Sequence, residues 1–293
     1  MQISVLSVNP DAYFNRRIVE ECRQTAIRAS VINPFRITAI GSGLFFGGEK
    51  IKSDIAFLRT PPYREEKDYI HIIGEILELN GVKTVNPPVA ADICGNKIQT
   101  KLQLEKKGIK TLKWAFVRHT ENLDHAVSAV GGYPVFLKTI FGTRGIGVVF
   151  CPCRETLTAY AQTMWAYNAN IFVEEFATDS AGSTVRVLVS NGTIIGAVKN
   201  SAAKTENEGE EMKLLRSNFS RGGNIEVYTP DEEMRHTAIE AARATGASLA
   251  GVDFIKTSSG FAVLEINSSP GIKGFEKAGG FNAAEAVVKS FTA

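Results

Sequence analysis

The sequence predicts an α/β fold that becomes α+β in its C-terminal part, and three observations lead to this prediction. Strand-like and helix-like segments alternate over residues 1–88. A glycine-rich loop at 142–147 joins two strand-like runs, and two hairpin signals stand in the C-terminal part of the chain. Alternating strands and helices are typical of a parallel sheet, whereas hairpins build antiparallel sheets.

Size and charge narrow the range of functions. The chain has 293 residues, 44% of them hydrophobic, which is enough for more than one domain. Lys and Arg total 33 and Asp and Glu total 31, a net charge of +2. This balance does not indicate the excess of basic residues that is typical of a nucleic-acid-binding protein. No apolar run has the length of a membrane span, and "MQISVLSVNP" lacks a signal-peptide pattern. We therefore expect a cytoplasmic protein that binds neither nucleic acid nor membrane.

The cysteines give no metal-site pattern. Cys151 and Cys153 lie close together, but Cys22 and Cys94 stand alone, so no second ligand pair has a matching spacing. We expect four reduced thiols, as is usual in a cytoplasmic protein.

The first predicted domain spans residues 1–88. Apolar runs and helical spacing predict strand, helix, strand, helix and strand at 3–8, 14–29, 53–59, 68–81 and 82–88. The stretch "GSGLFFGG" neither follows a clear strand nor opens a helix, so we expect an ordinary loop there rather than a dinucleotide fingerprint.

The second predicted domain spans residues 89–173. Asn96 is expected to cap a helix that runs to Lys107, and Thr120 a helix that runs to Val130. The remaining predicted elements are strands at 113–118 and 170–176, a helix at 154–166, and the two strands beside the glycine loop.

The third predicted domain spans residues 174–293. Asn191-Gly192 is a strong hairpin signal and is expected to join the two strands of 184–198. The acidic stretch at 204–213 is expected to form a mobile loop. Helices at 231–245 and 282–291 flank a second hairpin, "AGVDFIK" with "FAVLEIN".

The glycine loop lies in the stretch "FLKTIFGTRGIGVVF". A dinucleotide or Walker loop would open a helix, but Gly147 is followed by the strand-like Val148–Phe150. Glycines still let successive N–H groups point at a phosphate. Lys138 stands in an otherwise apolar strand, where burial is costly without a partner such as phosphate. A plain hairpin turn with an edge-strand lysine is the alternative, and this stretch alone does not decide between them.

A pair of carboxylates is expected in the second hairpin. If Ser258-Ser259-Gly260 forms a three-residue turn, Ile255 pairs with Val263 and Asp253 pairs with Glu265. Asn267 then shares their face of the sheet. Facing carboxylates repel unless a cation lies between them, and a set of oxygen ligands favours Mg²⁺ or Mn²⁺ over zinc. A solvated polar face is the alternative.

Cationic residues stand between these two motifs. Arg216, Asn218 and Arg221 crowd the segment "LLRSNFSRGG", and Arg186 alternates with valines in the first hairpin. Guanidinium groups match phosphate and carboxylate oxygens, whereas the alternative is a basic surface loop.

Taken together, "FLKTIFGTRGIGVVF", "FVEEF", "RSNFSRGG", "GVDF" and "LEINSSPG", in this order, resemble the ATP-grasp ligases. Within that superfamily the chain is similar to the RimK-type carboxylate–amine (alpha-L-glutamate) ligases. The resemblance implies an ATP-grasp fold with an N-terminal Rossmann-like pre-ATP-grasp domain. It also implies a nucleotide held between two α+β subdomains.

The resemblance also assigns roles. Lys97 and Lys138 match the lysines that contact ATP phosphates. The hinge that reads adenine matches Glu174, Glu175 and Phe176, and the phosphate-covering loop matches Gly142, Thr143, Arg144, Gly145, Ile146 and Gly147. The metal ligands, for two Mg²⁺ or Mn²⁺ ions, match Asp253, Glu265 and Asn267.

Further roles concern the substrates. Arg216 matches the arginine at the transferred phosphoryl group, with Asn218 and Arg221 near the carboxylate or its amine acceptor. Where the family often has Asp-Ile-Arg, this chain has Thr184-Val185-Arg186, so Arg186 is kept and Thr184 is assigned as a nucleotide contact in place of the acid.

The implied activity is amide formation through an acyl phosphate, with release of ADP and phosphate. The resemblance implies that L-glutamate or another amino acid is added to a protein C-terminus or a small-molecule carboxylate. It also implies a homo-oligomer, either a dimer or a tetramer. A ligase for a non-glutamate amino acid or a carrier protein is one alternative. A catalytically silent ATP-binding regulator is another.

Overall fold

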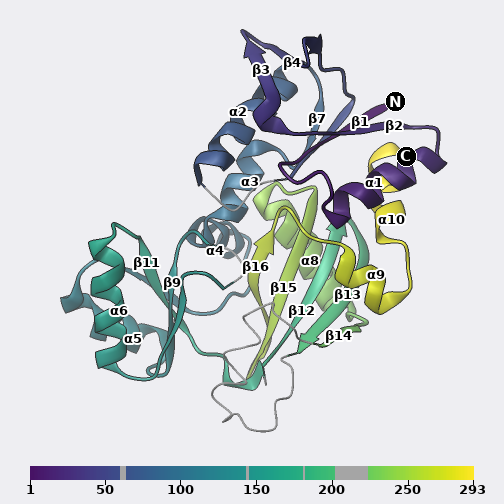
Figure 1. The fold of residues 1–293 in the computed structure, drawn as a ribbon. Helices are drawn as coiled ribbons and strands as arrows, with labels where there is room; N and C mark the ends of the chain where they lie inside the picture. The colour runs from purple at the N-terminus through teal and green to yellow at the C-terminus, as the bar shows by residue number, and fades with distance from the viewer. Residues whose placement is uncertain (60–63, 143–144, 181, 202–223) are drawn as a thin grey trace.

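The computed structural model describes residues 1–59, 64–142, 145–180, 182–201 and 224–293, and the side chains of 64–66 are not described. Three units share the chain (Figure 1): an N-terminal unit at the top, a unit around α5 and α6 at the lower left, and a C-terminal sheet at the centre. The expectation of mixed α/β architecture is confirmed.

The N-terminal unit is built on a parallel sheet with the order β2-β1-β6-β7. Its central strands β1 and β6 are buried on both faces, which a sheet covered by helices on both sides requires. Helices α1 and α10 cover one face and α2 covers the other. The bounds are β1 Gln2–Leu6, α1 Tyr13–Gln24, β2 Arg28–Ile32, β6 Ile55–Leu58, α2 Arg64–Leu79, β7 Lys83–Val85 and α10 Ala283–Thr292.

Three predictions for this unit were wrong. The helix expected over 14–29 ends at Gln24, because Ala26 adopts a left-handed φ of 56° and the chain turns into β2. The stretch expected to be a loop, 41–48, forms part of a small antiparallel sheet with the order β3-β4-β5. The strand expected over 82–88 ends at Val85, before a helix that begins at Pro88. The bounds are Ile37–Ile40 (β3), Gly43–Phe46 (β4), Glu49–Lys50 (β5) and Pro88–Gly95 (α3).

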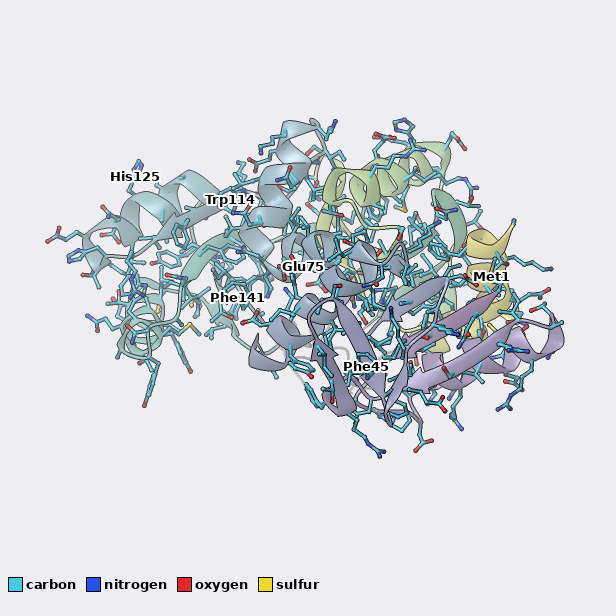
Figure 2. The ribbon with its side chains drawn as sticks, turned by 90° about the horizontal axis from the view of Figure 1, so that it is seen from above. Met1, Phe45, Glu75, Trp114, His125 and Phe141 are labelled. Carbon is cyan, nitrogen blue, oxygen red and sulfur yellow. The ribbon has the colours of Figure 1, made fainter. Side chains whose placement is uncertain are left out.

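The central unit is an antiparallel sheet with the order β10-β9-β11-β8. Helices α5 and α6 pack on one face, on which Val135, Leu137 and Val173 are buried. Lys138 and Glu174 alternate with these residues and lie on the other face. The bounds are α4 Lys97–Lys106, β8 Trp114–Val117, α5 Leu123–Val130, β9 Val135–Thr139, β10 Val148–Cys151, α6 Arg154–Ala166 and β11 Ile171–Glu175. Trp114 and His125 of this unit lie far from Met1 and Phe45 of the first (Figure 2).

Two helix starts were predicted in this unit, and one is confirmed. The Asn96 side chain accepts hydrogen bonds from the N–H groups of Ile98 and Gln99, so it caps α4 as expected. Thr120 is not a cap, because it begins the 3₁₀ helix Thr120–Asn122, which the His119 side chain caps.

The C-terminal unit is an antiparallel sheet with the order β14-β13-β12-β15-β16, and α8 packs on one of its faces. Asn191 and Gly192 adopt φ angles of 46° and 78°, so the predicted turn between β12 and β13 is confirmed. The bounds are β12 Ser183–Ser190, β13 Thr193–Ser201, β14 Asn224–Val227, α8 Glu232–Thr245, β15 Leu249–Thr257, β16 Gly260–Asn267 and α9 Lys273–Gly279.

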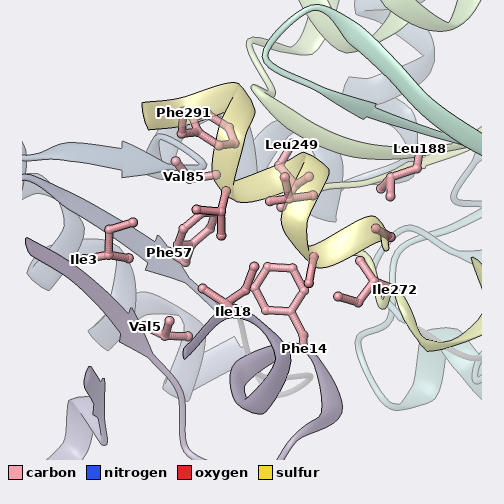
Figure 3. Close-up of a cluster of buried hydrophobic side chains, with 14 of the residues drawn as sticks. Ile3, Val5, Phe14, Ile18, Phe57, Val85, Leu188, Leu249, Ile272 and Phe291 are labelled. Carbon is pink, nitrogen blue, oxygen red and sulfur yellow. The ribbon is translucent and has the colours of Figure 1, made fainter. Parts of the chain in front are cut away.

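The first and last units share one hydrophobic core (Figure 3). Ile3 and Phe57 of the parallel sheet pack with Leu249 and with Phe291 of α10. The rings of Phe57 and Phe291 meet edge to face, with centroids 5.7 Å apart. No described helix is both long and apolar enough to cross a bilayer.

Candidate active site

A buried carboxylate on the central sheet binds two lysines. Glu174 of β11 is 1% exposed, and its two oxygens accept hydrogen bonds from different ammonium groups. Lys101 Nζ lies 2.8 Å from Oε1, and Lys138 Nζ donates to Oε2. Burial alone would raise the pKa of Glu174, but the two lysines outweigh it and lower the pKa below its ordinary value. The three side chains therefore form a compact group with a net positive charge.

The glycine loop lies at the end of the same strand pair. Gly142, Gly145 and Gly147 all adopt positive φ angles, of 143°, 77° and 76°, which side-chain-bearing residues rarely adopt. A Cβ on Gly142 would lie 2.6 Å from the carbonyl oxygen of Ile146, and one on Gly147 would overlap Thr139 Oγ1. The loop therefore requires glycines at both positions.

Lys97 links this loop to the rest of the site. Its Nζ donates to the carbonyl oxygen of Gly142 at 2.9 Å. Burial and Lys138 lower the pKa of Lys97, whereas Glu265 and Glu174 act in the opposite direction. Lys97 therefore lies close enough to both sheets for their carboxylates to affect its pKa, namely Glu174 on the central sheet and Glu265 on the C-terminal sheet.

A pocket opens between these two sheets. Phe136 and Glu174 line it from the central sheet, and Ile255 and Leu264 line it from the C-terminal sheet. The ring of Phe176 packs on those of Phe136 and Phe150, with centroids 5.5 and 5.3 Å apart. The complete lining is Leu112, Phe136, Lys138, Glu174, Glu175, Phe176, Ala177, Ser180, Ile255 and Leu264.

The carboxylate pair occupies the far face of the C-terminal sheet from α8. Asp253 of β15 pairs directly with Glu265 of β16, as predicted, and Asn267 follows Glu265 on the same face. The predicted turn was wrong, because Thr257 pairs with Gly260 and leaves a two-residue Ser258-Ser259 turn. Ile255 consequently pairs with Ala262, not with Val263.

A β-bulge restores the register that the shorter turn would have changed. Phe254 pairs with Val263 and Asp253 pairs with Glu265, so Leu264 is the extra residue of the bulge. Without that extra residue, the present sequence would bring Leu264 opposite Asp253 and turn Glu265 towards α8.

Arg186 neutralises part of this acidic pair. Its Nε and Nη2 donate to the two oxygens of Asp253, both at 2.5 Å, and Nη2 lies 3.9 Å from Glu265 Oε1. Burial and Glu265 raise the pKa of Asp253 to about 6, against the opposing effect of Arg186. Thr184, two residues before Arg186 on β12, is buried on the same face of the sheet.

The donor set on this face suits a hard cation. Two carboxylates and the amide of Asn267 supply oxygens only, as Mg²⁺ prefers. Among the described residues, no group of three or more His, Cys, Asp or Glu side chains could hold a metal. A metal here would therefore rest on the carboxylate pair, the amide and oxygens brought by a ligand.

A RimK-like ATP-grasp domain matches residues 94–291. The chain belongs to the RimK-like ATP-grasp family.

Relatives of this RimK-like ATP-grasp chain match it along nearly its whole length. A probable alpha-L-glutamate ligase of Marinomonas sp. is 31% identical over 303 residues, covering 99% of this chain and 94% of the relative. The chain is therefore an ATP-dependent carboxylate–amine ligase.

Solved structures share the ATP-grasp fold. The ATP-grasp ligase PsnB with its minimal precursor superposes with a TM-score of 0.78 at 19% identity, covering 99% of this chain and 97% of that one. PsnB with a phosphomimetic precursor variant, Mg and ADP superposes with a TM-score of 0.75 at 18% identity, covering the same 99% and 97%. The predicted ATP-grasp fold is confirmed.

Sequence reasoning missed the second lysine that contacts Glu174. Lys101 stands one helical turn after Lys97 and so shares its face of α4, but only the folded structure shows that this face meets Glu174. Five predicted site residues lie outside the described ones, namely Thr143, Arg144, Arg216, Asn218 and Arg221.

Proposed function

We propose that this ligase joins the amino group of L-glutamate to the carboxylate of a protein tail or small molecule. The observation that carries the proposal is the arrangement across the pocket. Lys97, Lys138 and the glycine loop lie on one side, and Asp253 and Glu265 lie on the other, close enough for Glu265 to affect the pKa of Lys97. The full-length similarity to a probable alpha-L-glutamate ligase supports the choice of glutamate.

The nucleotide is proposed to lie between the two sheets. Phe136, Phe176 and Leu264 offer apolar surface for adenine, and the backbone of Glu174, Glu175 and Phe176 would read its edge. The phosphates would extend towards Lys97, Lys138 and the loop of 142–147, with Thr184 as a further contact. Phosphate oxygens would then replace the Gly142 carbonyl as acceptors for Lys97.

The proposed metal ligands are Asp253, Glu265 and Asn267, holding two Mg²⁺ or Mn²⁺ ions. The PsnB complex with Mg and ADP supports the presence of a metal beside the nucleotide. Metal held there would neutralise the charge that develops on the phosphate oxygens.

The proposed reaction has two steps. A substrate carboxylate oxygen attacks the γ-phosphorus of ATP, the bond to ADP breaks, and an acyl phosphate forms. The glutamate amino group then attacks the acyl carbon, phosphate leaves, and the amine loses a proton. Lys97 and Lys138 would hold the phosphates in line, and Arg186 would hold Asp253 in place and stabilise charge on the transferred group. We also propose that Arg216 binds the transferred phosphoryl group, and that Asn218 and Arg221 bind near the substrate carboxylate or its amine acceptor.

The test is a screen for ADP release with a panel of amino acids and carboxylate acceptors, followed by mass spectrometry of the product. L-glutamate-dependent release with a product heavier by one glutamyl unit is the expected result. Turnover only with another amino acid or a carrier peptide would favour a ligase for a non-glutamate amino acid or a carrier protein. The structure of PsnB with its minimal precursor supports this second candidate. Nucleotide binding without amine-dependent turnover would indicate a regulator. Light scattering would test the expected homo-oligomer.

Glu265→Gln tests the metal assignment directly. Loss of one carboxylate from the pair should lower Mg²⁺-dependent ADP release by at least about 100-fold while the protein stays folded. Glu226→Gln, on the exposed strand β14, is the matched control and should retain activity. Full turnover of the Glu265 variant would contradict the assignment.

A further inference from the structure

Arg59 is a half-buried cation that the proposed reaction does not use. It follows the carboxyl end of β6, and its N–H extends the ladder by donating to the carbonyl oxygen of Leu6 at 2.9 Å. Ligands of open parallel sheets bind beyond the carboxyl ends of the strands. The backbone position of Arg59 is therefore both fixed and suited to binding.

The guanidinium of Arg59 is held by neutral groups alone. Nη2 donates to the carbonyl oxygens of Ser269 and Pro270, both at 3.1 Å, and Cζ lies 4.0 Å from the ring centroid of Phe14. Phe14 is itself fixed in the shared core beside Ile272 (Figure 3). Nε and Nη1 donate to no described residue, so N–H groups remain for a ligand.

Other partly buried arginines of the described chain bind carboxylates. Arg17 contacts Glu20, Glu21 and Glu276, and Arg186 contacts Asp253. Arg59 makes no ion pair with any described residue. Burial accordingly lowers the pKa of Arg59 to about 10, which leaves it charged at neutral pH. A neutral donor would suffice to bind two carbonyls, so a structural role alone does not account for the charge.

The carbonyls that bind Arg59 belong to the segment directly after the proposed metal ligands. Asn267 Oδ1 accepts a hydrogen bond from the Ser269 N–H at 2.9 Å. A Cβ on Gly251 would lie 3.3 Å from Pro270 Cβ and 3.4 Å from Arg186 Cδ, so this segment packs beside Arg186. Arg59 therefore stands between the N-terminal sheet and the acidic face.

We propose that Arg59 binds a carboxylate of the amino-acid substrate. It thereby selects an amino acid with an acidic side chain or with a free α-carboxylate. This inference rests on the proposed function. The acceptor carboxylate is consumed at the phosphoryl group, whereas the amino acid keeps its carboxylates through the reaction. A lasting counter-charge therefore suits the amino acid better than the acceptor.

The test measures discrimination between acids and amides by calorimetry. L-glutamate, L-glutamine and L-glutamate α-amide are titrated into the full chain saturated with ADP and MgCl₂. The wild-type protein should bind L-glutamate about 10- to 100-fold more tightly than one of the two amides, and that amide identifies the recognised carboxylate. In Arg59→Met this ratio should fall to near one, with ADP affinity unchanged, and Arg59→Lys should restore part of it.

Arg17→Met is the matched control. Arg17 also joins the N-terminal unit to the C-terminal part, through Glu276 and Asn282, but its loss should lower stability without changing the acid-to-amide ratio. An unchanged ratio in both Arg59 variants would overturn the role of Arg59 alone. Absence of any amino-acid-dependent ADP release by the wild-type protein would overturn the proposed function as well. If another amino acid supports release, the same titration is run with that acid and its amides, which tests Arg59 independently of glutamate.

Discussion

At the scale of residues, Glu174 is a buried carboxylate on which two lysines depend for charge compensation. Its carboxylate is buried between Lys101 and Lys138, and neither lysine has another carboxylate partner among the described residues. Removal of the negative charge would leave two ammonium groups uncompensated in a region of low dielectric constant. The integrity of the central sheet therefore depends on this one side chain.

Glu174→Gln should consequently destabilise the protein by about 3 to 5 kcal/mol, because it breaks a buried charge pair from one side. Urea denaturation followed by fluorescence measures the change. Glu175→Gln is the neighbouring control and should change the free energy of unfolding by less than about 0.5 kcal/mol. Equal stability of the two variants would show that the lysines find other partners.

The same residue predicts a pH dependence. Because the lysines lower the pKa of Glu174 below its ordinary 4.5 in the folded protein, its stabilising effect is complete above that ordinary value. The effect is lost as the pH falls through the lower folded pKa. The difference in unfolding free energy between wild type and Glu174→Gln should therefore shrink below about pH 4.5. A difference that grows on acidification would contradict the direction of the pKa shift.

Residue patterns predicted some side-chain positions but not others. The period of two of a β-strand is enough to place Lys138 on the opposite face of β9 from Val135 and Leu137. Lys101 and Arg59 escaped notice because their partners stand 73 and 210 residues away in the chain, as the pairs Lys101–Glu174 and Arg59–Ser269 show. Such contacts depend on how units pack, and a single sequence does not show this.

At the scale of elements, the glycine loop gives the sharpest test. Gly147 and Gly192 adopt nearly the same φ, 76° and 78°, so alanine should cost each about 1 to 2 kcal/mol. A Cβ on Gly147 would also overlap Thr139 Oγ1, whereas one on Gly192 meets nothing closer than 3.8 Å. Gly147→Ala should therefore lower ADP release by about tenfold or more, because the loop proposed to hold the phosphates must move.

Gly192→Ala controls for the backbone cost alone and should keep its rate of ADP release. Both variants are compared at a temperature at which circular dichroism shows them folded. Equal rates would mean that the loop adjusts around the added methyl group and that its glycines are not needed for turnover.

The second hairpin shows how an element can be predicted correctly for an incorrect reason. The pairing of Asp253 with Glu265 was inferred from a three-residue turn, and the structure reaches it through a two-residue turn and a bulge at Leu264. The two routes add the same single residue to β16. Bulges leave little trace in a sequence, so the functional register was predictable although its mechanism was not.

At the scale of the whole molecule, α10 completes the core of the N-terminal unit. Phe291 is 6% exposed and packs on Phe57, on one face of the parallel sheet. Phe291→Ala should therefore lower the free energy of unfolding by about 3 to 5 kcal/mol. Circular dichroism and fluorescence should both show one unfolding transition, with a lower midpoint temperature than that of the wild type. Tyr167→Ala, at a side chain that is 84% exposed, should change little. Separate melting of the N-terminal unit would show that the shared core does not couple the units.

The overall order of the N-terminal elements was partly predictable, because buried parallel strands have a strong apolar signal. The strand at 28–32 and the small sheet at 37–50 were missed, since Ala26 gives no turn signal and short edge strands have weak patterns. The cover supplied by α10 was not predictable, because it joins segments from opposite ends of the chain.

That cover has a consequence for biosynthesis. During translation the strands at 2–6 and 55–58 leave the ribosome long before residues 283–292 exist, so one apolar side of their sheet is covered by α1 alone while the remaining chain is made. The nascent polypeptide should therefore expose apolar surface on this sheet until elongation is almost finished. We expect a chaperone to bind the nascent chain at this surface.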